Sequence, residues 1–111
     1  MCADRVYPSP RGLEFGSGAL TAMLSYASGV PGVFTGKPET VFFEELCRQL
    51  GADPRRCLLI GDNLESDVCG AKRMGMRCLL TLSGVTGEKD LLSLSAEQRP
   101  DGVVKGLMEL A

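Results

Sequence analysis

The stretch that decides the fold is Cys57-Leu58-Leu59-Ile60-Gly61-Asp62-Asn63-Leu64-Glu65-Ser66-Asp67. Its first four residues are apolar and have the length of a buried strand, and three acids follow closely behind them. In open α/β sheets, ligands bind at the carboxyl ends of the strands. A carboxylate in that position suits a hard cation or phosphate chemistry. We therefore expect Asp62 and Asp67 to line a metal or phosphate site.

The acidic loop also has a purely structural interpretation. Asn63 can cap the helix that follows, and Glu65 and Asp67 would then only complement the positive end of that helix. Lys37 is open to two interpretations in the same way. A lysine at a helix start is usually solvated, but it can also bring a mobile positive charge to a phosphate oxygen. The functional interpretation gains weight because Lys37 and Asp62 are each expected to follow a strand of one sheet.

Apolar runs and turn residues alternate along the chain. Residues 1–15 contain two prolines and a glycine and are expected to be irregular. Strands are expected at 33–35, 57–60, 76–82 and 100–104. Helices are expected at 19–28, 38–50, 65–74 and 89–94, with a last helical turn through residue 110. This alternation predicts one α/β domain with a parallel sheet.

Composition excludes several classes of function. The net charge of −2 and the scattered basic residues give no surface for nucleic acid. No apolar stretch approaches the roughly 18 residues that span a membrane, and the first residues lack the apolar core of a signal peptide. We therefore expect a cytoplasmic protein with neither a nucleic acid nor a membrane as partner.

Cysteine and histidine usage narrows the chemistry further. The five cysteines form no Cys-x-x-Cys pair and lie mostly in apolar runs, which predicts core packing in a reducing compartment. The chain has no histidine, so serine–histidine and cysteine–histidine catalysis and the usual zinc sites are excluded. Oxygen ligands without histidine or a cysteine cluster favour Mg²⁺.

Four segments in order resemble the haloacid dehalogenase-like (HAD-like) hydrolase superfamily, closest to its nitrophenylphosphatase, phosphoglycolate phosphatase and pyridoxal-phosphate phosphatase branch. The segments are Gly36-Lys37-Pro38, the 57–67 stretch, Gly75-Met76 and Leu80-Thr81-Leu82-Ser83-Gly84-Val85-Thr86. The resemblance covers nearly the whole chain. It implies the second half of a Rossmann-like three-layer core with flanking helices at residues 19–111. Residues 1–18 would be the remnant of the segment that returns from the family's cap domain.

The resemblance also implies residue roles. Lys37 would neutralise the phosphoryl group and the nucleophilic aspartate. Asp62 would bind Mg²⁺ directly, and Asp67 would complete the metal site as the outer acid that orients metal-bound water or the lysine. The implied reaction is the hydrolysis of a small phosphorylated metabolite through an aspartyl-phosphate.

One departure from the family pattern is large. The sequence contains no Asp-x-Asp, the motif that supplies the family's nucleophile and general acid, and the second motif and most of the cap have no counterpart. We therefore expect this C-terminal portion to be inactive alone, while keeping weak Mg²⁺ or phosphate binding. One explanation is a truncated gene or gene model that has lost the N-terminal half.

The absent family strand would lie beside the strand that ends at Asp62, which leaves an open sheet edge. The alternative is therefore a non-catalytic binding or regulatory module that pairs this edge with a full-length relative, as a homo- or hetero-oligomer. A receiver-like domain is disfavoured because no acidic cluster lies on a strand before Asp62.

Overall fold

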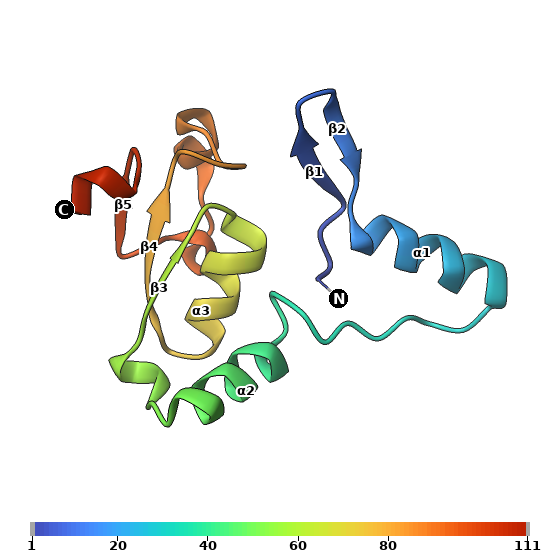
Figure 1. The fold of residues 1–111 in the computed structure, drawn as a ribbon, viewed down its shortest axis with the longest axis horizontal. Coiled ribbons are helices and arrows are strands. Elements are labelled where there is room, and N and C mark those ends of the chain that lie inside the picture. Colours follow the sequence, from blue (N-terminus) through green and yellow to red (C-terminus); the bar gives the residue numbers. More distant parts are fainter. Residues whose placement is uncertain (1, 111) are drawn as a thin grey trace.

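A computed structural model describes residues 2–110, and its centre is a sheet of three short parallel strands (Figure 1). The strands are β3 (Leu58–Gly61), β4 (Arg77–Thr81) and β5 (Gly102–Val104), in the order β3-β4-β5. Both pairings are parallel, with Leu59 opposite Cys78 and Leu80 opposite Val103. The predicted α/β class, the parallel sheet and the flanking helices are confirmed.

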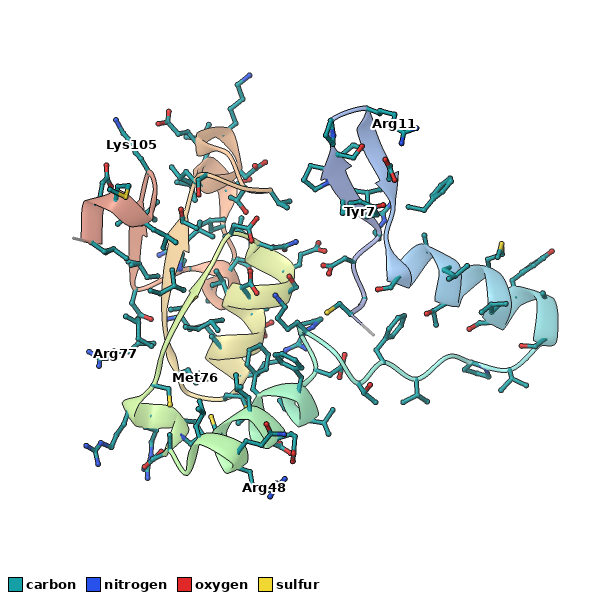
Figure 2. All side chains as sticks on the ribbon, in the orientation of Figure 1. Tyr7, Arg11, Arg48, Met76, Arg77 and Lys105 are labelled. Carbon is teal, nitrogen blue, oxygen red and sulfur yellow. The ribbon has the colours of Figure 1, made fainter. Side chains whose placement is uncertain are left out.

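The hydrophobic core lies between the sheet and two helices, α2 (Thr40–Leu50) and α3 (Cys69–Arg73). The buried side chains come from α2, from the helical segment around α3 and from β4: Phe43, Cys47, Val68, Ala71, Met76, Cys78 and Leu80. In Figure 2, Met76 lies near the helices at the base of the sheet, whereas Arg77 points away from them. This alternation is the pleat of a strand with one covered face.

The other face of the sheet and the outer edge of β3 are open. Leu58 and Ile60 alternate with the half-buried Leu59 and are 53% and 44% exposed. Among residues 2–110, β3 pairs with β4 alone, so its second edge has no backbone partner. The expected strand at 33–35 would be a further strand of this sheet, but that prediction is wrong. Residues 31–35 form no strand and lead from the end of α1 toward α2, apart from the sheet.

The first 15 residues contain an antiparallel hairpin, β1 (Val6–Ser9) with β2 (Gly12–Phe15), so the prediction of an irregular segment was wrong. Proline breaks a central strand, but a two-stranded hairpin has two open edges where the missing N–H is not needed. Gly12 takes a φ of +117° at the turn, which only glycine adopts readily. The Tyr7 hydroxyl donates to Glu14 Oε2 across the strands at 2.7 Å.

Helix α1 (Ser17–Ser28) follows the hairpin and stands apart from the sheet (Figure 1). It begins two residues before the expected start because the Gly16–Gly18 backbone docks on the chain's first residues. The N–H groups of Gly16 and Gly18 donate to the carbonyls of Arg5 and Asp4, each at 2.9 Å. A Cβ on Gly18 would lie 2.6 Å from the carbonyl carbon of Ala3, so the glycine allows this close approach.

The remaining elements match the expected positions with different helix types. The expected helix at 65–74 is a π-helical turn (Leu64–Val68) that continues into α3. The expected helix at 89–94 is a 3-10 helix (Glu88–Ser93), and the last turn is another (Leu107–Leu110). The cysteines are all free, and Cys47, Cys69 and Cys78 are buried as packing residues. Within residues 2–110, no helix is long and apolar enough to cross a membrane.

Candidate active site

Asp67 is the centre of the candidate site. It lies on the π-helical turn and is 3% exposed. Its Oδ1 is 2.6 Å from Lys37 Nζ, and its Oδ2 accepts from the backbone N–H groups of Asp62 and Asn63, each at 3.1 Å. Both carboxylate oxygens are therefore held, and they connect the end of β3 to the loop before α2.

The loop after β3 is shaped by a cap and by a glycine. Asn63 Oδ1 accepts from the N–H groups of Glu65 and Ser66 at 2.9 and 3.1 Å, so Asn63 does cap the following turn. A Cβ on Gly61 would lie 2.5 Å from Asp67 Oδ2, so a larger residue would displace that carboxylate. Asp67 therefore does more than complement a helix dipole, because its side chain folds back onto the strand end.

Asp62 follows β3 directly and is held by the loop after β4. Its Oδ2 accepts from the Val85 N–H at 2.8 Å, and its main-chain carbonyl accepts from the Thr86 N–H at 3.0 Å. Its Oδ1 has no hydrogen-bond partner within residues 2–110. Asp62 thus presents one carboxylate oxygen that is free to bind a ligand.

Lys37 lies in the loop before α2, and its side chain is 31% exposed. Partial burial lowers the pKa of Lys37, but the hydrogen bond from its ammonium to Asp67 and the negative charges of Asp67 and Asp4 outweigh burial, so the pKa lies above the usual lysine value. The ammonium is therefore positive at neutral pH and acts as a fixed charge rather than as a general base.

The donor set can be tested against the implied Mg²⁺. Mg²⁺ prefers oxygen ligands and keeps several waters, so it often takes only one or two carboxylates from the protein. The free oxygen of Asp62 fits that requirement, whereas Asp67 already accepts from three donors. Within residues 2–110, no group of three or more His, Cys, Asp or Glu side chains could hold a metal. The residues therefore fit a Mg²⁺ ion with Asp62 as its one direct protein ligand, while Asp67 holds the backbone of Asp62.

A cavity of about 590 Å³ adjoins this site, between the residues before β1 and the loops after β3 and β4. Asn63, Val85 and Thr86 line it beside the candidate site. Its charged lining residues are of both signs: Arg5 and Lys89, with Asp4, Glu65 and Asp90. No sequence pattern singled out Arg5 and Lys89, because isolated basic residues are usually solvated. The Val85 N–H was missed for a different reason, since a backbone donor carries no side-chain signature.

Of the three residues singled out in the sequence, Lys37 and Asp67 have side chains in contact, whereas Asp62 joins them only through its backbone. Lys37 and Asp67 are in direct contact across 30 positions of sequence, and Asp67 binds the backbone N–H of Asp62. The Asp62 carboxylate instead pairs with the loop after β4. The arrangement combines a partly buried cation–carboxylate pair with one accessible carboxylate oxygen, which suits an anionic ligand and a hard cation together.

Comparison with known proteins identifies the family of this chain. The "HAD-hyrolase-like" family model matches residues 34–110. The 5'-nucleotidase YutF of Bacillus subtilis (strain 168) is 42% identical over 83 residues, which are 75% of this chain and 32% of that protein. The chain spans about a third of the length of the curated relatives it matches first.

Solved structures agree with the sequence matches. A p-nitrophenyl phosphatase from Archaeoglobus fulgidus superposes with a TM-score of 0.81 at 31% identity, covering 97% of this chain and 42% of that one. A glycerol phosphate phosphatase from Mycobacterium tuberculosis in complex with magnesium gives 0.84 at 30% identity, covering 97% and 32%. From its family model, its relatives and its fold, this chain belongs to the HAD-like hydrolases.

Proposed function

We propose that this chain carries the lysine and magnesium half of a phosphomonoesterase site. The observation that carries the proposal is Asp67, whose one carboxylate joins the Lys37 ammonium to the backbone that leads into Asp62. The names of the related proteins support it, since they include a p-nitrophenyl phosphatase and a glycerol phosphate phosphatase bound to magnesium. The substrate class would be small phosphorylated metabolites.

Each residue has a distinct role in this proposal. Lys37 would bind a phosphoryl oxygen and offset its negative charge, which is where a phosphoryl-transfer site gains most. Asp67 would hold the Lys37 ammonium in place, and Asp62 would offer its free Oδ1 to Mg²⁺. Bound Mg²⁺ supplies further positive charge to the phosphoryl group.

The proposed reaction needs a nucleophile that this chain does not carry. In the reaction, an aspartate carboxylate attacks the phosphorus of the ester and the alcohol leaves. Water then hydrolyses the aspartyl-phosphate, which releases inorganic phosphate and restores the aspartate. The sequence has no Asp-x-Asp. We therefore propose that residues 19–111 act as the second half of such a core, that residues 1–18 are the remnant of a cap-to-core segment, and that the chain alone does not turn over phosphate esters.

The test combines binding and turnover on the 111-residue chain. We expect no Mg²⁺-dependent hydrolysis of p-nitrophenyl phosphate, together with weak Mg²⁺ binding that Asp62→Asn removes. Asp53→Asn is the matched control, because Asp53 pairs with the exposed Arg55 on the surface. Robust hydrolysis that Asp62→Asn abolishes would contradict the inactive state. A chain that binds neither Mg²⁺ nor inorganic phosphate would contradict the half-site itself.

A second candidate function is favoured by the open sheet. The chain exposes 7671 Å², whereas a compact folded monomer of 11.8 kDa exposes about 5,900 Å². The excess of about 1,800 Å² is more than the roughly 1,000 Å² that each partner buries in a small obligate interface. It is spread over the hairpin, α1 and the sheet, where Phe15, Tyr26 and Leu58 are exposed. The chain would then be a binding or regulatory module that pairs the free edge of β3 with a full-length relative.

Sizing and co-purification test this second function. Ile60→Lys places a charge beside the free edge of β3. Val103→Lys is its control on β5, the opposite edge strand, since the two side chains are 44% and 43% exposed. Association should be lost in Ile60→Lys and kept in Val103→Lys. A well-behaved monomer that captures no relative would rule the module out.

A further inference from the structure

Gly84 lies against the side chain of Asp62, 22 positions earlier in the sequence. A Cβ built on Gly84 would have three nearest neighbours, and all three are Asp62 atoms: Oδ2, then Cγ at 2.5 Å and Cβ at 2.6 Å. Real Cβ atoms do not approach other heavy atoms so closely. The space that an alanine methyl would need is therefore filled by the Asp62 carboxylate.

Backbone geometry does not explain this glycine. The glycines with positive φ in the described chain are Gly12, Gly29, Gly51 and Gly75. Gly84 is not one of them, so other residues could adopt its backbone conformation. What such a side chain would meet first is Asp62, which supplies all three of its nearest atoms.

Val85, the residue after Gly84, fixes the orientation of the Asp62 carboxylate. The Val85 N–H donates to Asp62 Oδ2 at 2.8 Å, and the Thr86 N–H donates to the Asp62 carbonyl at 3.0 Å. A Cβ at Gly84 would push Oδ2 off the Val85 N–H. The loop therefore determines which Asp62 oxygen is engaged and leaves Oδ1 as the accessible one.

We propose that Gly84 is a positioning residue for Mg²⁺ binding, because its missing side chain lets the Val85 N–H fix the Asp62 carboxylate with Oδ1 free. The proposal deepens the proposed function and rests on Asp62 being the direct ligand. It assigns the loop after β4 the task of presenting the ligand oxygen. Asp67 has a parallel arrangement, since it lies against Gly61.

The first test is Mg²⁺ titration of the full chain followed by amide NMR. Gly84→Ala should weaken Mg²⁺ binding at least tenfold and shift the Val85 amide resonance before any metal is added. Gly106→Ala is the matched control, since no atom lies within 4 Å of a Cβ there and its φ is not positive, and it should bind Mg²⁺ within twofold of the parent chain. Unchanged Mg²⁺ affinity in Gly84→Ala would overturn the proposal.

The second test contains no metal and so separates this proposal from the proposed function. Gly84→Ala should lower the urea midpoint of the parent chain but should have little effect in an Asp62→Gly background, where the obstructing side chain is gone. An equal loss in both backgrounds would show that the alanine meets something other than Asp62 and would overturn the proposal. A parent chain that binds no Mg²⁺ would instead refute the proposed function, while this cycle would still decide whether Gly84 positions Asp62.

Discussion

Asp67→Asn removes one charge from the centre of the site and leaves its shape almost unchanged. In the parent chain the two carboxylate oxygens of Asp67 accept from three donors: Lys37 Nζ and the N–H groups of Asp62 and Asn63. An amide has one acceptor oxygen and one donor group. Whichever way the asparagine turns, its NH₂ must face either the ammonium or the backbone N–H pair.

The size of the effect follows from burial. Removing one partner of a buried ion pair costs about 3–5 kcal/mol, because the other charge is left without compensation. Asp67 is 3% exposed, but the Lys37 side chain is 31% exposed and can regain some water. We therefore expect Asp67→Asn to lower the free energy of unfolding by about 3 kcal/mol, the lower end of that range.

Urea unfolding followed by circular dichroism measures this loss, and a double-mutant cycle assigns it. Lys37→Met should cost less than Asp67→Asn, since Asp67 keeps its two backbone donors. The two changes should couple by about 1–3 kcal/mol, as residues in direct contact do. Glu45→Gln, which breaks an exposed pair with Arg48, is the control at under about 1 kcal/mol. An Asp67→Asn loss no larger than that of the control would refute the reasoning.

Three further predictions concern the scaffold of the site. Gly70→Ala would place a Cβ 2.5 Å from Cζ of the fully buried Phe43, so it should destabilise the chain by about 1–3 kcal/mol in urea unfolding. The hydrogen bond from Lys72, followed by the N–H of Cys78, lowers the pKa of Asp101 in the folded state. Asp101 should therefore stabilise the folded chain at pH 7, and Asp101→Asn should remove that contribution. The contribution should disappear as the pH falls below the pKa of about 3.9 in the unfolded chain and through the lower pKa in the folded chain. Burial, with a smaller contribution from the Asp67 charge, raises the pKa of Cys78 to about 11, so its thiol should resist a disulfide reagent at pH 7 until the chain unfolds.

Each of these predictions has a result that would contradict it. The Gly70→Ala loss should shrink in a Phe43→Leu background, and an undiminished loss would point to another clash. Parallel stability–pH curves for Asp101→Asn and the parent chain would show that this carboxylate has the same pKa in both states. Mass spectrometry can measure the rate at which Cys78 is modified. A rate higher than the unfolding rate of the chain would show that the thiol is not buried.

The sheet could be predicted from the sequence where its signals are local. The apolar run before Gly61 and the stretch around Leu80 are each long enough and apolar enough to be strands without knowledge of their partners. The cap at Asn63 is equally local, because its bonds reach only two and three residues ahead. These parts of the fold follow from periodicity and turn chemistry alone.

The errors occurred where a segment's structure depends on its partner. Residues 33–35 have strand-like composition, but a strand forms only beside another edge, and none lies there. The hairpin at residues 6–15 was missed because its prolines argue against a strand, although an open edge tolerates them. The contact between Val85 and Asp62 was beyond reach for the same reason, since it joins a backbone N–H to a side chain 23 positions away.

The contact between Lys37 and Asp67 affects whether the side-chain entropy of Lys37 is lost during folding or during ligand binding. A free lysine side chain carries about 2 kcal/mol of rotamer entropy, which a site normally loses when its ligand arrives. Here the ammonium lies 2.6 Å from Asp67 Oδ1, an ion pair formed within the fold itself. Most of that disorder is therefore lost during folding, when burial of the core can offset it. If a phosphate binds at Lys37, less of the entropy of that side chain remains to be lost.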